Sequence, residues 1–313
     1  MKGLTASGPG PTRPNSLLHK ELWLFCYNSF FCEVWGGQTP IIVYNGGSKA
    51  YNERATMLKF SLANAKTHAL AAIPELQAYL TDKRKIYSLD LLSGYSCPFA
   101  NACLSKAVEI DGKRRIVDGP NNEFRCFSAS QEAQYTNVYN SRKHNFDTLR
   151  GLHLNDMIVA LNDSMPKNTG IVRIHVAGDF FNQSYMLAWA TMAMMHEDKL
   201  FYAYTKSLKY WLALRETIED IDNFVLTASY GGRDDDLIGK EGLRYADVVF
   251  TEKAAEWAGL EIDHDDSHAA RPSMRNTSFA LLLHGTQPKD TDAAVALKEL
   301  KGKGSYNRKG MTV

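Results

Sequence analysis

Short apolar runs alternate with helical patterns from about residue 85 to the end of the chain. The runs are rich in β-branched and aromatic residues, and strands are predicted at Ile86–Leu92, Ile171–Ala177, Leu200–Thr205, Phe224–Ser229, Asp247–Thr251 and Phe279–Leu283. Apolar residues at steps of three and four predict helices at Phe146–Leu161, Tyr185–Met195, Tyr210–Ile218 and Ala293–Leu300. Strands that alternate with helices of this length predict parallel βαβ units.

Several predicted strands also alternate apolar and polar side chains. In the strand over 171–177 one row is apolar, and the other row carries Arg173, His175 and, beyond the strand end, Asp179. A parallel sheet covered by helices on both faces would be apolar on both sides. Polar groups that point into a lumen explain the alternation better. The sequence therefore predicts an α/β fold, a full or partial (βα) TIM-like barrel with parallel strands.

The first part of the chain has a different pattern. Residues 1–16 are rich in Gly, Pro and Ser and are predicted to be a flexible tail. Residues 17–84 are expected to form a mainly helical extension, with a short strand at Ile41–Tyr44 and a helix at Asn52–Leu80 that is interrupted at Pro74. Residues 85–313 are then the barrel-like domain.

Composition excludes several classes of protein. With 44% hydrophobic and 23% charged residues among 313, the chain is typical of an ordinary globular protein. A net charge of +1 gives no overall attraction to nucleic acid or to an anionic membrane, and the basic runs Lys83–Lys85 and Lys113–Arg115 are expected in solvated loops or helix ends. Leu22–Phe31 is too short and too polar to span a bilayer.

Cysteine usage points to a reducing compartment. The five cysteines are an odd number, and no N-terminal signal pattern accompanies them, so a cytoplasmic location is expected. Cys26 and Cys32 are six residues apart, which does not place both on one helical face, and we interpret them as structural thiols.

The remaining three cysteines carry the candidate chemistry. Cys97 and Cys103 follow the predicted strand Ile86–Leu92 by a few residues, and Cys126 follows a turn farther on. Functional groups of a parallel barrel gather at the carboxyl ends of the strands, so these thiols are expected to converge there. Their spacing matches neither paired Cys-x2-Cys zinc sites nor ferredoxin motifs. Three ligands favour iron over zinc, which usually takes four, but structural thiols remain an alternative.

A resemblance favours the cluster. The segments GYSCPFANACLSKA, EFRCFSASQEA, HNFDTLR, IVRIHVAGDFFNQSY, FYAYTKSL and TASYGGR, and the closing FALLLHGTQPKDTDAAVALKELKGKGSY, resemble the bacteriophage family called gene product 88 over roughly Tyr87 to Tyr306. The family's cysteines and predicted barrel are similar to those of radical S-adenosylmethionine enzymes, which implies a [4Fe-4S] cluster. For a bacteriophage protein, the expected cytoplasm is that of the host cell. The chain departs from the Cys-x3-Cys-x2-Cys motif that accompanies S-adenosylmethionine binding.

Further residues are candidates for the surroundings of such a cluster. His175 or Asp179 is a candidate fourth ligand or hydrogen-bond partner, with Arg173 beside them, and the alternative is a buried Arg173–Asp179 ion pair. Lys206 and Arg233 could bind a phosphate or carboxylate with the amides of the Gly231-Gly232 turn. His144 and His284 are expected to be packing or capping residues, and the segment His264–His268 a solvated loop.

Three functions are consistent with the sequence. The first is an iron-sulfur protein in electron transfer or a radical reaction, with an unknown small molecule or redox partner. The second is a redox-inactive module that binds nucleic acid through the basic runs and the aromatic residues Tyr202, Tyr204 and Trp211. The third is a barrel stabilised by zinc.

Overall fold

The computed structural model describes residues 31–36, 39–44 and 57–301, and the chain forms two compact units, 1–51 and 52–313. In the first unit, strands β1 (Phe31–Gly36) and β2 (Thr39–Tyr44) pair antiparallel. The predicted strand Ile41–Tyr44 is confirmed and lies within β2. The predicted tail and Cys26 lie outside the described residues.

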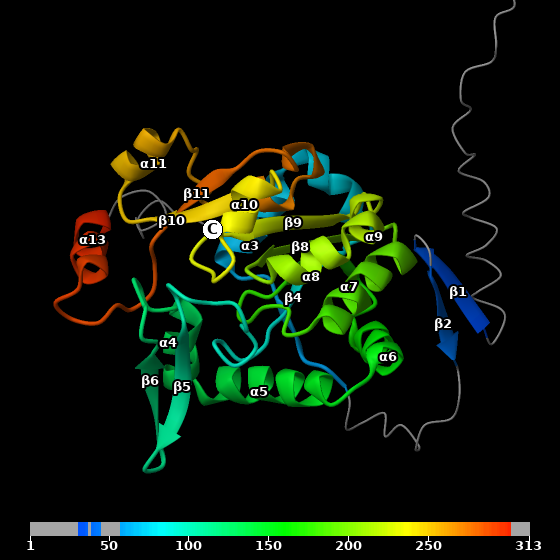
Figure 1. Ribbon diagram of the computed structural model, residues 1–313, viewed down its shortest axis with the longest axis horizontal. Helices are drawn as coiled ribbons and strands as arrows, with labels where there is room; N and C mark the ends of the chain where they lie inside the picture. The colour runs from blue at the N-terminus through cyan, green and yellow to red at the C-terminus, as the bar shows by residue number, and fades with distance from the viewer. Residues whose placement is uncertain (1–30, 37–38, 45–56, 302–313) are drawn as a thin grey trace, which may run out of the picture. The chain divides into compact units, whose positions relative to one another are not determined.

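A seven-stranded sheet organises the second unit (Figure 1). Its six parallel strands lie side by side in the order in which they occur along the chain: β4 (Lys85–Leu89), β7 (Thr169–Ile174), β8 (Leu200–Thr205), β9 (Phe224–Ser229), β10 (Tyr245–Val249) and β11 (Phe279–Leu282). Strand β3 (Phe60–Leu62) pairs antiparallel with β4 at one edge. The predicted parallel βαβ units are therefore confirmed.

The sheet is open in the part of the chain that the structure describes. Strands β11 and β3 are its two ends, and no pairing among the described residues joins them into a ring. The structure is thus a mixed α/β fold with a mostly parallel sheet. Closure into a TIM-like barrel stays a prediction.

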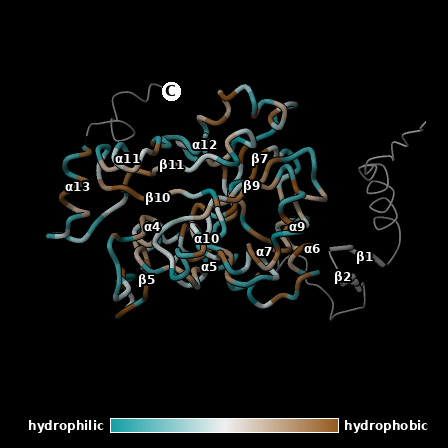
Figure 2. Tube along the Cα trace, turned by 45° about the horizontal axis from the view of Figure 1, so that its top comes forward, coloured by the Kyte–Doolittle hydropathy of each residue, from teal (hydrophilic) through white to brown (hydrophobic). Residues whose placement is uncertain are grey.

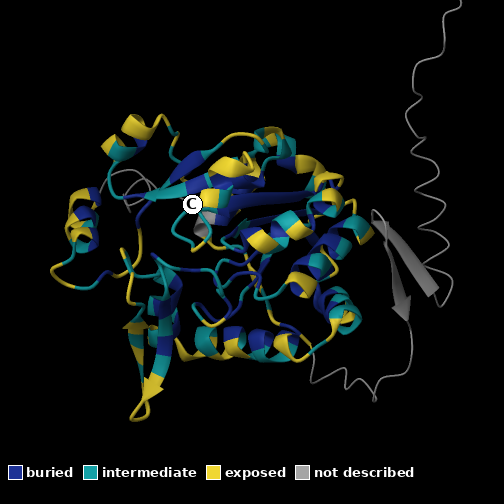
Figure 3. Ribbon diagram, viewed as in Figure 1, coloured by how far each residue is buried: buried dark blue, intermediate teal, exposed yellow. Residues whose placement is uncertain are grey.

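Helices cover one face of the sheet: α5 (Thr136–Arg150), α6 (Leu154–Ser164), α7 (Gln183–Met195), α8 (Leu208–Ala213) and α9 (Arg215–Glu219). Val172 and Ile174 of β7 pack there with Trp189 of α7 in the largest core cluster. Figure 2 shows hydrophobic segments inside, around β9 and α7, and Figure 3 shows exposed positions on the outer sides of the helices.

The other face is covered by shorter elements: α3 (Ala65–His68), the 3-10 turns η1 (Ala69–Ala72), η2 (Pro74–Tyr79) and η3 (Pro272–Met274), and α12 (Ser267–Ala270). Ile86, Ile171, Leu200 and Val225 pack there, near the amino ends of their strands. Farther along the same rows stand Arg173, Tyr204 and Lys206. The predicted alternation between an apolar and a partly polar face is correct for these strands, although α12 covers part of the polar row.

Three predicted helices are wrong in extent. The helix predicted at Tyr210–Ile218 is divided at Leu214 between α8 and α9. The helix predicted at Asn52–Leu80 is replaced, in its described part, by β3, α3 and the turns η1 and η2, with Pro74 at the start of η2. The helix predicted at Phe146–Leu161 is divided between α5 and α6, because the chain leaves the helix at Gly151 and begins a new one after His153. Periodicity extended across these breaks because apolar residues continue on each side.

The remaining elements lie beyond the carboxyl ends of the strands or at the edge formed by β11. A hairpin of β5 (Ser105–Ile110) and β6 (Lys113–Asp118) follows the first two cysteines of the site and leads into α4 (Phe127–Gln134). The basic run Lys113–Arg115, predicted to be a loop or helix end, therefore lies on a strand. Three further helices are α10 (Asp236–Lys240), α11 (Glu252–Ala258) and α13 (Asp292–Leu300). No helix in the described ranges combines the length and apolar character needed to cross a bilayer.

Candidate functional site

The loop after β4 carries Cys97 and Cys103. Its first turn is tight: the amide of Gly94 donates to the sulfur of Cys97 at 3.4 Å. Gly94 has φ +73°, and a Cβ there would lie 2.4 Å from the carbonyl oxygen of Ser105. Only glycine satisfies both conditions, so this position brings the start of the loop against the strand β5 that follows it.

The turn after β9 holds the segment between these two cysteines. Amides of Asn101 and Ala102 both donate to the carbonyl of Gly231 at 3.0 Å, and the amide of Arg233 donates to the carbonyl of Phe99 at 2.9 Å. The amides of Gly231 and Gly232 donate to the Asp235 carboxylate at 2.8 and 2.9 Å. The predicted anion site at the Gly231-Gly232 turn is therefore wrong, because Asp235 already uses those amides.

Cys126 stands at the amino end of α4. The backbone amides of Ser128 and Ala129 favour its thiolate, as the end of a helix does. Ser105 also anchors it, because the amide of Cys126 donates to the Ser105 hydroxyl at 3.2 Å. The side chain of Gln287 binds both the amide and the carbonyl of Arg125, at 2.7 and 3.0 Å. The loop after β11 thus positions the third cysteine beside the first two.

The three thiols lie within electrostatic range of one another. Burial raises the pKa of Cys97 well above its ordinary value, and the charges of Asp179, Cys126 and Cys103 raise it further. Burial also raises the pKa of Cys126 to about 11, with Cys103 as the next cause. The three cysteines that the sequence singled out, from two separate loops, therefore lie close enough for their charges to influence one another. All three are reduced.

The described residues hold no group of three His, Cys, Asp or Glu side chains arranged around a single metal ion. A tetrahedral zinc site with Zn–S bonds of about 2.3 Å needs sulfur atoms within about 4 Å of one another. An iron-sulfur cluster is several atoms across and holds its thiolates farther apart. The observed group of thiols is thus looser than a site for one ion.

Asp179 lies beside Cys97, and its carboxylate is fully engaged. It accepts hydrogen bonds from the Thr205 hydroxyl at 2.6 Å and from the amides of Lys206 and Phe180 at 2.8 and 2.7 Å. Burial raises its pKa. The predicted position of Asp179 near the cysteines agrees with the structure. Its hydrogen bonds connect the loop after β7 to the end of β8.

Arg173 and His175 do not share one row, contrary to the prediction. Arg173 projects onto the face covered by α12, where it pairs with Asp266 and lies 5.3 Å from the centre of the Tyr204 ring. His175 lies past the end of β7 with φ +67°, which turns its ring to the other face, and its Nε2 is 3.1 Å from the Tyr185 hydroxyl. Burial lowers the pKa of His175 to about 3. The predicted alternative, an Arg173–Asp179 ion pair, is also wrong.

The two cationic candidates, Lys206 and Arg233, have different surroundings in the structure. Lys206 donates its ammonium to the Ser229 hydroxyl at 2.6 Å. The Arg233 side chain is exposed, and we find no partner for its guanidinium among the described residues. The two therefore do not form a built anion site. Of the aromatic residues considered for nucleic acid, Tyr202 is fully buried and Trp211 is 9% exposed, so neither is free to stack on a base.

The other histidines have structural contacts. His144 is hydrogen-bonded to the carbonyl of Met57 at 2.8 Å, and His284 packs on Phe127 with ring centres 4.4 Å apart, as expected for packing residues. The segment His264–His268 is not the solvated loop that was predicted. Asp266 within it and Asp263 directly before it are buried, and Asp266 is the partner of Arg173.

A buried network behind the cysteine loop was missed at the sequence level. Glu132 of α4 accepts from the amide and hydroxyl of Ser93 at 3.0 and 2.8 Å and pairs with Arg142 of α5 at 3.1 Å. Arg142 is also 3.6 Å from Asp90. Burial raises the pKa of Glu132. The network connects the start of the cysteine loop to the helix that begins after Cys126, and no motif in the sequence indicated it.

Comparisons with known proteins place the chain in a family. The sequence profile described as Gene product 88 matches residues 56–300. The chain is 25% identical over 178 residues to the Gene 88 protein of Mycobacterium phage L5 and 29% identical over 122 residues to that of Mycobacterium phage D29. These alignments cover 52% and 36% of the chain, and 66% and 43% of the relatives, so the chain spans about half the length of the relatives it matches.

No solved structure matches the chain. The profile, by contrast, covers the whole seven-stranded unit from before β3 to the end of α13, including both cysteine loops. The two relatives and the family profile carry the same gene 88 designation. The protein belongs to the Gene product 88 family of bacteriophages.

Proposed function

We propose that Cys97, Cys103 and Cys126 hold an iron-sulfur cluster, a [4Fe-4S] cluster by the number of ligands, and that the protein serves in electron transfer or a radical reaction. The observation that carries the proposal is the proximity of three half-buried thiols from two loops, each within range of the others' charge. The raised pKa values of Cys97 and Cys126 disfavour their thiolate forms in the absence of a bound cation. A cluster supplies the positive iron ions that would stabilise them.

The surroundings of the thiols also suit a cluster. The amides of Gly94, Ser128 and Ala129 direct N–H groups toward Cys97 and Cys126. Hydrogen bonds to ligating sulfur atoms are one of the means by which a protein sets a cluster's reduction potential. Three cysteines leave one iron of a [4Fe-4S] cluster without a cysteine ligand. That position is where an unknown small molecule would bind if the reaction is a radical one.

The spacing of the cysteines does not support S-adenosylmethionine as a cofactor. Cys-x5-Cys with a third cysteine 23 positions later is not the motif that accompanies S-adenosylmethionine. The proposal therefore rests on the cluster itself and does not include that cofactor. A cluster used for electron transfer requires a redox partner.

The test is metal analysis of protein purified and reconstituted without oxygen. We expect brown protein with broad visible absorbance, about four iron and four sulfide per chain, and an electron paramagnetic resonance signal after reduction. Cys97→Ser, Cys103→Ser and Cys126→Ser should each lose the colour and most of the iron, because each removes one ligand.

Cys26→Ser and Cys32→Ser are matched controls, since they remove the chain's other two thiols. Both variants should keep the cluster. Colourless, iron-free protein after reconstitution would refute the proposal. One zinc per chain, lost in the same three variants, would replace it with the zinc-stabilised alternative.

A further inference from the structure

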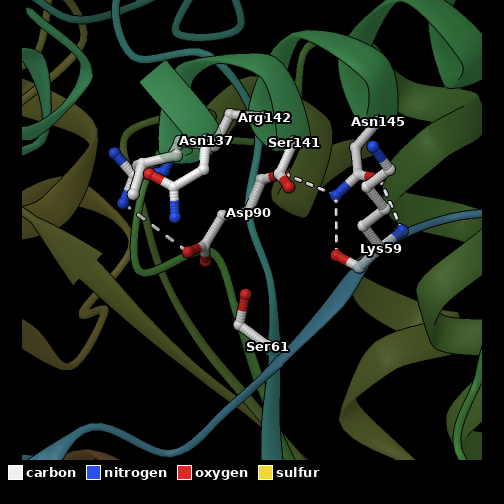
Figure 4. A pocket seen from close by; sticks show the side chains of 8 residues that line it. Lys59, Ser61, Asp90, Asn137, Ser141, Arg142 and Asn145 are labelled. Atoms are coloured by element: carbon white, nitrogen blue, oxygen red, sulfur yellow. Dashed lines mark hydrogen bonds and ion pairs between the residues drawn. The ribbon is translucent and has the colours of Figure 1, made fainter. Parts of the chain in front are cut away.

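A polar cavity lies away from the cysteines, between α5 and the strands β3 and β4 (Figure 4). Its volume of about 160 Å³ equals the share of about five water molecules in the liquid. All but one of the lining residues are polar: Lys59, Ser61, Asp90, Asn137, Val138, Ser141, Arg142 and Asn145. A cavity of this size and lining suits a small ligand with several hydrogen-bonding groups.

Some of the lining side chains already have hydrogen-bond or ion-pair partners within the protein. The side chain of Asn145 accepts a hydrogen bond from the amide of Lys59 at 2.8 Å and donates to the carbonyls of Lys59 and Asp90, both at 3.0 Å. Arg142 is paired with Glu132 at 3.1 Å. These residues form rigid walls. Figure 4 shows Asp90 in the middle of the group, between the side chains of α5 and Ser61.

Other groups of the lining have unused capacity. The Asp90 carboxylate accepts a hydrogen bond from the amide of Val176 at 2.8 Å, and its second oxygen forms an ion pair with Arg142 at 3.6 Å, a distance that leaves its lone pairs open to a closer hydrogen-bond donor. Among the described residues, the hydroxyls of Ser61 and Ser141 and the side chain of Asn137 have no protein partner. The Lys59 ammonium has no acidic partner in this part of the chain either. The cavity therefore offers an anionic and a cationic group at once.

We propose that this cavity binds a small free α-amino acid. The ligand's ammonium group would bind the second oxygen of Asp90, with the Ser61 and Ser141 hydroxyls as further acceptors. Its carboxylate would bind Lys59 and the amide of Asn137. A purely cationic or purely anionic ligand would leave one of these charged groups unused, and the volume admits only a short side chain. The site is distinct from the proposed cluster, because no cysteine lines it.

Glycine and L-serine are the probes, and isothermal titration calorimetry with thermal unfolding is the measurement. Either amino acid should bind with a millimolar or tighter dissociation constant and raise the melting temperature. Ethanolamine lacks the carboxylate and acetate lacks the amine, so each should bind at least about tenfold more weakly. Equal binding by one of these analogues, or binding by none of the probes, would overturn the proposal.

Variants locate the site. Asp90→Asn keeps an oxygen for the Val176 amide but removes the charge, and it should weaken amino-acid binding by about tenfold or more. Ser61→Ala and Ser141→Ala should each weaken it several-fold while the unliganded melting temperature stays unchanged. Asp147→Asn is the matched control, because Asp147 is on the same helix, pairs with Lys143 and Arg150, and lies outside this cavity. Unchanged binding in Asp90→Asn would refute the assignment, and metal analysis of the same samples tests the cluster separately.

Discussion

At the scale of single residues, His175 shows how one backbone angle redirects a side chain. Its φ of +67° is uncommon for a residue other than glycine, and it moves the ring from the row of Arg173 to the side of Tyr185 and Phe180. His175 is 4% exposed, and its Nδ1 has no hydrogen-bond partner among the described residues. A protonated imidazole would be costly in this position, which is why its pKa is lowered to about 3.

Stability should therefore fall in acid through His175. The unfolded chain binds a proton on this histidine near its ordinary pKa of about 6.5, whereas the folded protein binds it only near pH 3. Between these values the unfolded state holds one more proton, so the free energy of unfolding should decrease by about 1.4 kcal/mol for each pH unit lowered. Urea unfolding at several pH values measures this slope.

His175→Asn is the informative variant for this prediction. Asparagine tolerates positive φ but does not titrate, so the slope between pH 4 and 6 should decrease by about one proton. His144→Asn is the control, because His144 is hydrogen-bonded at the surface. An unchanged slope in His175→Asn would show that this histidine is not buried in its neutral form.

At the scale of elements, α4 connects the cysteine loops to the helical layer. Cys126 stands at its amino end, and Glu132, one turn and a half farther on, reaches Ser93 and Arg142. Glu132 is fully buried. Ser93 and Arg142 are also buried, so the Glu132 carboxylate is needed to neutralise the charge of Arg142. The same carboxylate holds the cysteine loop against α4.

Glu132→Ala should destabilise the protein by about 3 kcal/mol or more, because it removes the nearest countercharge of the buried Arg142. The same change should speed the alkylation of Cys97, since the amide and hydroxyl of Ser93 lose their acceptor. Chemical unfolding and the rate of thiol modification measure the two effects. Glu109→Ala is the control: Glu109 is exposed on β5, and its loss should cost less than about 0.5 kcal/mol. Equal stability of the two variants would contradict this role of α4.

At the scale of the whole seven-stranded unit, the segment around α12 covers the polar half of the sheet's second face. Asp266 is buried with φ +67°, pairs with Arg173 of β7 and accepts from the Tyr202 hydroxyl of β8 at 3.2 Å. Arg244, also buried, donates to the backbone carbonyls of His268 and Ala269 at 3.1 and 3.2 Å. The segment around α12 thus covers strands β7 and β8, which precede it in the sequence by more than 60 residues.

Asp266→Asn should therefore cost about 3 kcal/mol of unfolding free energy, because Arg173 loses a buried countercharge while the backbone conformation is kept. Denaturant unfolding is the measurement. Asp290→Asn is a matched control, since Asp290 also has positive φ but is exposed, and its stability should stay within about 0.5 kcal/mol of the parent. A similar loss in both variants would mean that the Arg173 ion pair contributes little.

The sequence by itself determined where the parallel strands lie along the chain, to within a few residues, and that they run parallel. Strands β8 and β9 begin and end at the residues that their apolar runs predicted, and Cys97, Cys103 and Cys126 were singled out before any contact was known. Hydrophobic periodicity and chain order are local properties, so local reasoning was sufficient for these features. The breaks within three predicted helices were the main local errors.

Only the tertiary structure decided which polar groups meet. Asp266 rather than Asp179 pairs with Arg173, Asp235 rather than a ligand occupies the Gly231-Gly232 amides, and Glu132 joins the cysteine loop to α4. Each of these contacts, apart from the Asp235 turn, joins residues far apart in the sequence, where many alternative partners have the same charge. Burial makes the correct pairing decisive, because a charge or hydrogen-bonding group removed from water must find its partner in the folded chain.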